Sequence, residues 1–109
     1  MSTMSNNARA IVNKTIGNVS VKVGDNVLGI GLDDYCLPCI SYLFIEERNE
    51  DGTYTIRTRD AYPIRIIFNS LDGLYPDNLK NRSAIRNACK QVCNEHFTEV
   101  NEQLNSIKK

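Results

Sequence analysis

The stretch from Ile40 to Asn69 constrains the fold more than any other part of the chain. It holds the densest run of apolar side chains, interrupted by one clear turn at residues 49–52. Glycine at position 52 supplies the positive φ that closes such a turn between two antiparallel strands. We therefore predict a hairpin here, followed by a third strand that begins after Pro63.

The position of the turn also predicts which side chains share a face of the sheet. If Glu47 lies opposite Thr53, then Phe44 lies opposite Ile56, because side chains alternate between faces along each strand. The face expected to form the core comprises Ile40, Tyr42, Phe44, Tyr54, Ile56, Ile64, Ile66 and Phe68. The opposite face comprises Ser41, Leu43, Ile45, Thr55, Arg57, Arg59, Arg65 and Ile67.

The beginning of the chain carries weaker signals. Its first seven residues are polar, and we expect them to be disordered. Apolar side chains at positions 8, 11, 12 and 16 fit one side of a short helix that ends at Gly17. Val, Asn, Thr and Ile within this segment are weak helix formers, so a strand over residues 8–16 is an open alternative.

A second hairpin is predicted between residues 19 and 32. Valines alternate with polar residues from 19 to 23, a Gly-Asp-Asn turn follows, and an extended run resumes at Val27. Gly29 and Gly31 lie on one face of the second strand, where the missing side chains let another element approach closely. We interpret this feature as a helix-packing site, with a ligand site as the alternative.

The C-terminal third predicts one long helix. Apolar or partly apolar side chains recur there at spacings of three and four residues, at Ile85, Cys89, Val92, His96, Val100, Leu104 and Ile107. Asp77 or Asn78 is suited to cap the first turn. A helix of this length is longer than a typical sheet is wide, so its last turns would offer an apolar stripe to a second copy of the chain.

These elements together predict a single α+β domain over residues 1–109. It would contain a mainly antiparallel sheet of about five strands, with the long C-terminal helix packed on it. Thirteen Lys and Arg balance thirteen Asp and Glu, so the net charge does not favour nucleic acid or an anionic membrane. No apolar run approaches the ~20 residues of a membrane span, and the N-terminus lacks a signal-peptide core. We expect a small soluble protein of the cytoplasm with reduced cysteines.

The four cysteines offer the most specific alternative function, a metal site. Cys36 and Cys39 form a Cys-x-x-Cys pair, and Cys89 and Cys93 lie one helical turn apart, a set that could hold zinc in a zinc-stabilised binding module. Cysteine on an apolar helical stripe is also typical of a small buried hydrophobic residue. We favour the second interpretation and expect no metal and no cofactor.

One family resemblance involves the first pair of cysteines. Cys36-Leu-Pro-Cys39 follows an apolar strand, and Pro63 later opens another, a combination that resembles the thioredoxin family. The resemblance implies a thiol redox protein in which Cys36 is the nucleophile and a cis-proline at position 63 packs against the disulfide. We keep this as a further alternative.

No set of residues converges as a catalytic site would. The one histidine, His96, lies on the apolar stripe, and the adjacent acidic pairs point to opposite faces of their strands. The leading hypothesis is a non-enzymatic adaptor, inhibitor or regulator that binds another protein through a sheet face or through the C-terminal helix. The expected surface combines aliphatic and arginine side chains, at Leu43, Ile45, Arg57, Arg59, Arg65 and Ile67. Nucleic acid is disfavoured because the aromatic residues fall on the other face.

Overall fold

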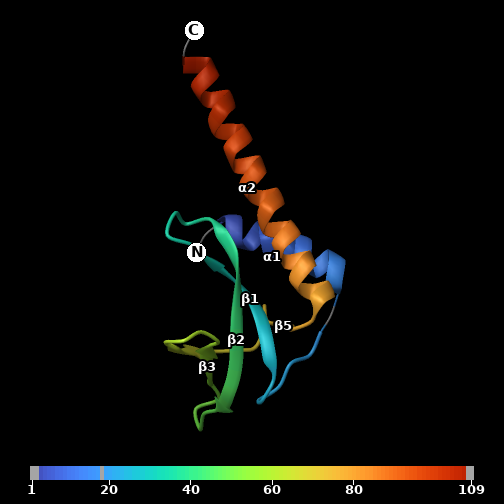
Figure 1. The fold of residues 1–109 in the computed structure, drawn as a ribbon, viewed down its shortest axis with the longest axis vertical. Helices are drawn as coiled ribbons and strands as arrows, with labels where there is room; N and C mark the ends of the chain where they lie inside the picture. Colours follow the sequence, from blue (N-terminus) through green and yellow to red (C-terminus); the bar gives the residue numbers. More distant parts are fainter. Residues whose placement is uncertain (1–2, 18, 108–109) are drawn as a thin grey trace.

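The structure, a computed structural model, describes residues 3–17 and 19–107, with side chains from residue 4 to residue 98. Its elements in chain order are α1 (Thr3–Ile16), β1 (Asn26–Leu32), β2 (Pro38–Arg48), β3 (Tyr54–Thr58), β4 (Arg65–Phe68), β5 (Tyr75–Pro76) and α2 (Leu79–Ile107) (Figure 1). The strands form one antiparallel sheet in the order β4-β3-β2-β1-β5. The predicted α+β class, with about five strands and a long C-terminal helix packed on the sheet, is confirmed.

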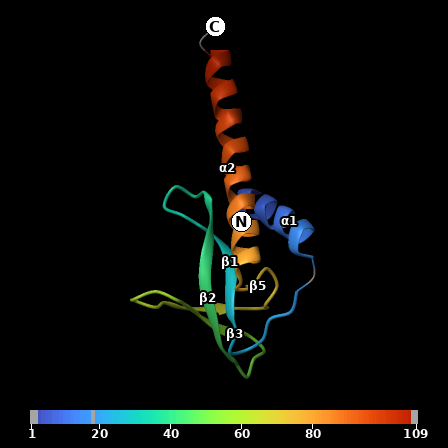
Figure 2. The same cartoon turned by 45° about the vertical axis from the view of Figure 1, so that its right-hand side comes forward.

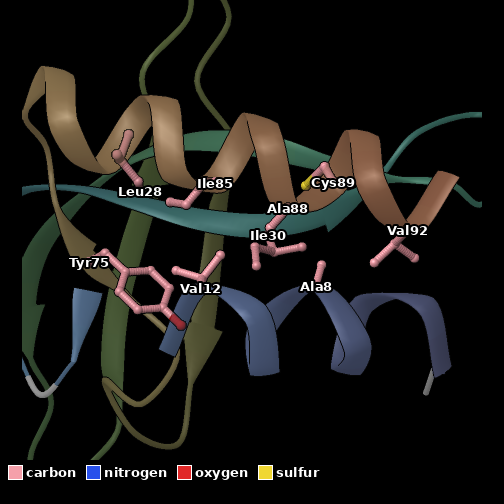
Figure 3. Packing of buried hydrophobic residues seen from close by; sticks show 9 residues of the cluster. All are labelled: Ala8, Val12, Leu28, Ile30, Tyr75, Ile85, Ala88, Cys89 and Val92. Carbon is pink, nitrogen blue, oxygen red and sulfur yellow. The ribbon is translucent and has the colours of Figure 1, made fainter. Parts of the chain in front are cut away.

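Both helices pack against the same face of β1 and β2, which we call the helix face. It carries Leu28 and Ile30 from β1 and Ile40 and Tyr42 from β2, which pair across the two strands. The cluster of buried residues that joins this face to the helices comprises Ala8, Val12, Leu28, Ile30, Tyr75, Ile85, Ala88, Cys89 and Val92. Figure 3 shows the side chains of α1, α2 and β1 pointing toward one another in this cluster. The predicted stripe of α2 is therefore core over its first three positions.

The start of α2 is fixed as the sequence predicted. The backbone N–H of Asn81 donates a 2.8 Å hydrogen bond to the side-chain oxygen of Asn78, which makes Asn78 the N-cap. The side chain of Asn81 also donates to the carbonyl of Pro76 at 2.8 Å, which ties the helix to β5. From there α2 extends well beyond the sheet (Figures 1 and 2), and the molecule measures 59 × 27 × 26 Å. The side chains of Val100, Leu104 and Ile107 lie outside the described residues.

The predicted register between β2 and β3 is wrong by one residue. A β-bulge between Ile45 and Glu47 places Phe44 opposite Arg57 and Ile45 opposite Ile56. The side chains of β3 therefore lie on the opposite faces from those expected relative to β2, because a shift of one residue moves every side chain to the other face. Of the predicted core face, Ile40 and Tyr42 do pack against the helix cluster. Ile56 is buried on the opposite face, and Ile64 and Ile66 are exposed.

Three predictions at the N-terminal end are corrected or decided. Of the seven residues expected to be disordered, residues 3–7 belong to α1, and residues 1–2 lie outside the described residues. Residues 8–16 are helix rather than strand. Residues 19–23 form no strand, so the predicted hairpin at 19–32 is wrong. The reason is that both sides of β1 are occupied, by β2 on one side and by β5 on the other. The fifth strand of the sheet is β5, for which the sequence offered no signal.

Candidate functional site

The six residues expected to form one binding surface do not lie together. Leu43 and Ile45 are buried in a second cluster of core residues, with Val27, Ile56 and Leu74. We call the side of the sheet that carries this cluster the glycine face, because Gly29 and Gly31 lie on it beside Leu43. The chain that crosses from β4 to β5 covers part of this face with Leu71 and Leu74. Two of the three aliphatic residues of the expected surface are therefore core, whereas the third, Ile67, is exposed.

Three of the six residues remain together, on the helix-face side of β3 and β4. Arg57 lies opposite Phe44 of β2 on one side and opposite Arg65 of β4 on the other, so Arg57, Phe44 and Arg65 share a face. One carboxylate holds both arginines, because Glu46 accepts from Nε of Arg57 and from Nε of Arg65, each at 3.0 Å. The guanidinium of Arg57 also lies 4.7 Å above the ring of Phe44. Ile67, two residues after Arg65, shares this face.

Arg59 serves a structural role instead. Its Nη2 lies 2.6 Å from Oδ2 of Asp77, whose other oxygen accepts from Nε of Arg82 at 2.6 Å. The hydrogen bonds from Arg82, and then from Arg59, lower the pKa of Asp77 to about 2 against the opposing effect of burial. The guanidinium groups of Arg59 and Arg82 lie 5.6 Å and 5.2 Å from the ring centre of Tyr42, and Arg86 donates to the hydroxyl of Tyr42. These contacts lock β5 and the start of α2 onto β2.

The outer edge of the sheet at β4 carries the most exposed apolar side chains near one another. Tyr62 is 89% exposed, Ile64 63%, Ile67 59% and Ile66 41%. β4 is the last strand on its side of the sheet, so in the described part of the chain its outer edge pairs with no strand. The β3–β4 hairpin stands away from both helices in Figures 1 and 2. Sequence reasoning had assigned Ile64 and Ile66 to the core, because an aliphatic run does not reveal which strand is the edge.

The hydrogen bonds between β3 and β4 show which backbone groups face outward. The N–H of Thr58 donates to the carbonyl of Ile64 at 3.0 Å. The backbone N–H and C=O groups of these two residues therefore point toward each other, into the space between β3 and β4. Because such pairs alternate along an antiparallel ladder, Ile66 also points its N–H toward β3. The N–H groups of Arg65 and Ile67 therefore point away from the sheet.

A pocket of about 420 Å³ opens on the glycine face. Gly29 and Gly31 line its floor, and aliphatic or aromatic walls come from Leu43, Ile66, Phe68 and Leu74. We call it the glycine pocket. The expectation that a helix packs against these glycines is wrong, since both helices lie on the other face of the sheet. The ligand alternative that the sequence left open is the one that the geometry fits.

The polar groups of the glycine pocket come from separate parts of the chain. Arg9 reaches it from α1, Thr58 from the end of β3, Arg59 and Asp60 from the residues that follow β3, and Asp72 from the loop before β5. The Nε of Arg9 is buried and has no hydrogen-bond partner among the described residues. Sequence reasoning missed Arg9 and Asp72, because nothing in the local sequence indicates that residues so far apart share a pocket.

The four cysteines do not form the arrangements considered from the sequence. Cys89 is buried, Cys39 and Cys93 are half-buried, and Cys36 is exposed in the β1–β2 turn with a φ of 61°. Burial first, and then the nearby Cys39 and Cys93, raise the pKa of the Cys89 thiol to about 11. Burial also raises the pKa of Cys39 and of Cys93. Such thiols stay protonated at neutral pH, which makes them poor nucleophiles. Within the described residues, no group of three or more potential ligands could hold a metal ion.

The resemblance to thioredoxins does not extend to the fold. In this chain a strand, β2, follows the cysteine pair, and Cys39 is its second residue. The described peptide bonds, including the one before Pro63, are all trans. The nucleophile and cis-proline roles implied by the resemblance therefore have no counterpart in the geometry of Cys36 and Pro63.

Comparisons with known proteins identify no relative. No protein-family model matches the chain, and searches of curated proteins and of solved structures found no match either. None of the described helices is long and apolar enough to cross a membrane. Function must therefore be inferred from the residues of this chain.

Proposed function

We propose that this protein is a non-enzymatic protein-binding domain that takes up an extended segment of a partner protein as an additional strand beside β4. The observation that carries the proposal is the group of exposed apolar side chains on and just before this open edge, from Tyr62 to Ile67. Exposed apolar side chains gathered in one place are typical of an interaction surface rather than of ordinary solvated surface. Such a domain would act as an adaptor, inhibitor or regulator.

The backbone of β4 supports strand addition. The outward N–H groups of Arg65 and Ile67 and the carbonyls beside them offer hydrogen bonds to an antiparallel or parallel partner strand. Protein edges that avoid such pairing usually carry a proline, an inward-pointing charge or a covering loop. β4 is short and carries one charged residue, Arg65, but it presents Ile66 and Ile67 on its two faces, and the nearest proline lies before the strand, at position 63.

The side chains beside this edge indicate the chemistry of the partner. Arg65 is exposed, and Glu46 engages it at Nε, which leaves the outer nitrogens of the guanidinium directed at solvent. An added strand would place alternate side chains next to Arg65 and Ile67 on one face and next to Ile66 on the other. We therefore expect a partner segment that alternates aliphatic residues with at least one Asp or Glu.

Two parts of the sequence-based hypothesis remain within this proposal. A cytoplasmic location suits four cysteines that are all free thiols. Binding of a second copy through the end of α2 is the alternative route to a partner, and it concerns side chains beyond the described ones. The β4 edge is favoured because its exposed residues are described and contiguous.

Selection from a displayed library of random peptides, each the length of a typical strand, tests the proposal. Enriched peptides should bind the wild-type protein and lose about tenfold or more in affinity to Ile67→Pro, which removes an outward N–H without touching the ladder to β3. Ile67→Ala keeps the N–H and should lose less. Leu79→Pro is the matched control, because proline is well tolerated at the first position of a helix and Leu79 lies in α2, far along the chain from β4.

Two results would reject strand addition at β4. One is a set of enriched peptides that bind Ile67→Pro as tightly as the wild type, and the other is a selection that enriches no peptide above an unrelated protein of the same size. A concentration-dependent dimer that Ile67→Pro dissolves would identify the added strand as a second copy of this chain, and would contradict the proposal of a different partner.

A further inference from the structure

The glycine pocket is a separate site, on the opposite side of the sheet from the arginines of β3 and β4. Its volume of about 420 Å³ falls within the range of small-molecule sites, which is roughly 300 to 1,000 Å³. Its lining combines aliphatic and aromatic side chains with a smaller exposed area of charged and hydroxyl groups. A pocket with these properties takes a small molecule with a substantial apolar part.

The two glycines let neighbouring side chains pack closely at the edge of this pocket. A Cβ atom at position 29 would lie 3.2 Å from Cδ1 of Leu43 and 3.4 Å from Cδ2 of Leu74, both of which line the pocket. A Cβ atom at position 31 would lie only 2.7 Å from Oγ of Ser41. Any larger residue at position 29 would therefore project among the side chains that form the pocket, or displace them.

Two cationic side chains line the pocket, Arg59 and Arg9, and the Nε of each is buried without a hydrogen-bond partner among the described residues. Arg59 is held by Asp77 at 2.6 Å, so Arg9 is the cation that a ligand can engage. The glycine conformation of residue 73 brings the backbone of the loop under this side chain, whose Nε and Cζ would lie 3.6 Å from a Cβ there. Nε is buried without a hydrogen-bond partner among the described residues. A buried N–H of a cationic group that lacks an acceptor is the kind of group that a ligand anion satisfies.

We propose that the glycine pocket binds a small amphipathic molecule with an apolar body and one anionic head group, and that Arg9 pairs with the head group. The apolar body lies against the apolar side chains that line the pocket, among them Ile66, Phe68 and Leu74. This site is additional to the strand-binding edge and does not depend on it.

The acidic side chains at the pocket limit the ligand to one negative charge. Asp60 and Asp72 also line it, and Asp72 immediately precedes Gly73, over which Arg9 lies. A second anionic group would meet these carboxylates and be repelled. Removal of the charge of Asp72 should therefore strengthen binding of a monoanion, since Asp72 is exposed and its carboxylate serves no ion pair among the described residues.

Two fluorescent probes separate the roles of the apolar body and the head group. 1-Anilinonaphthalene-8-sulfonate has an apolar ring system and one anionic sulfonate, and N-phenyl-1-naphthylamine has the same rings without the sulfonate. Both should bind the full-length protein at one saturable site. Arg9→Gln should weaken sulfonate-probe binding by about tenfold, and should change binding of the uncharged probe by less than about twofold. Lys14→Gln, which removes a cation from the same helix outside the pocket, should leave both affinities unchanged.

A second variant keeps the test decisive if Arg9→Gln loses stability. Asp72→Asn should increase the affinity for the sulfonate probe by about threefold and leave the uncharged probe unaffected. The proposal is overturned if the sulfonate probe binds wild type, Arg9→Gln and Asp72→Asn equally, or if neither probe gives saturable binding. It is also overturned if both probes respond to Arg9→Gln by the same factor. Peptide binding at β4 should be the same in wild type and Arg9→Gln, so the two sites can fail independently.

Discussion

The centre and the outer edge of the sheet are built from similar residues but have opposite surroundings. β1 and β2 are covered on the helix face by α1 and α2, and on the glycine face by residues such as Leu71 and Leu74. β4 is as aliphatic as β1, yet its isoleucines are exposed on both faces. Position in the sheet, rather than residue type, therefore decides burial here. An aliphatic strand that the fold leaves uncovered is a surface for something outside the fold.

The largest expected difference between the two regions concerns a pair of isoleucines. Ile56→Ala, at the fully buried position in β3, should lower the free energy of unfolding by about 3 kcal/mol, because it removes buried methyl groups and leaves a cavity. Ile67→Ala, in the adjacent β4, should lower it by less than about 1 kcal/mol. Urea titration of both variants measures the difference. Equal losses would show that β4 is part of the core, and would remove the contrast between the regions.

A second comparison is between two carboxylates, Asp77 and Glu46, each of which pairs with two arginines. The Asp77 side chain is 7% exposed and joins Arg82 of α2 to Arg59, the residue after β3, whereas the Glu46 side chain is 21% exposed and joins Arg57 to the 66% exposed Arg65. Asp77→Asn should cost on the order of 1 to 2 kcal/mol at neutral pH, since it leaves two arginines without their carboxylate. Glu46→Gln should cost less than about 1 kcal/mol, as exposed ion pairs usually do.

The pH dependence of stability provides the check. The pKa of Asp77 is lowered from 3.8 to about 2, so its contribution is present above about pH 4 and is lost as the pH falls through about 2. Wild-type stability should therefore decline over this interval, and Asp77→Asn should flatten the decline. Urea titrations at several pH values measure it. An unchanged slope in the variant would show that Asp77 is not held as described.

Sequence patterns sufficed for the features that depend on local chemistry. The 3.6-residue period located α2, Asn78 fitted its N-cap, and Gly52, with a φ of 87°, closed the predicted turn of the β2–β3 hairpin. The register was wrong because a β-bulge depends on how β2 and β3 twist together, which the residues around Glu46 do not indicate. β5 was missed because two residues are too short for any alternation to be visible.

The candidate sites depended more on tertiary structure. Arg57, Arg65 and Ile67 were expected to share a face, and they do. Leu43 and Ile45 were assigned to the same surface only because of the wrong register. Gly29 and Gly31 gave a sequence signal for the glycine pocket, but its charged residues come from other parts of the chain, with Arg9 from α1. Which helix lies near which loop is set by packing, so no local pattern places Arg9 beside Gly73.

Amide hydrogen exchange at β4, followed by NMR without and with a selected peptide, tests the account most directly. In the free protein the amides of Arg65 and Ile67 should exchange quickly, while that of Ile66 is protected by its hydrogen bond to β3. Saturating peptide should slow exchange at Arg65 and Ile67 by about tenfold or more, because these N–H groups then donate to the added strand. Protection of both amides in the free protein, or no added protection with the peptide bound, would contradict strand addition at this edge.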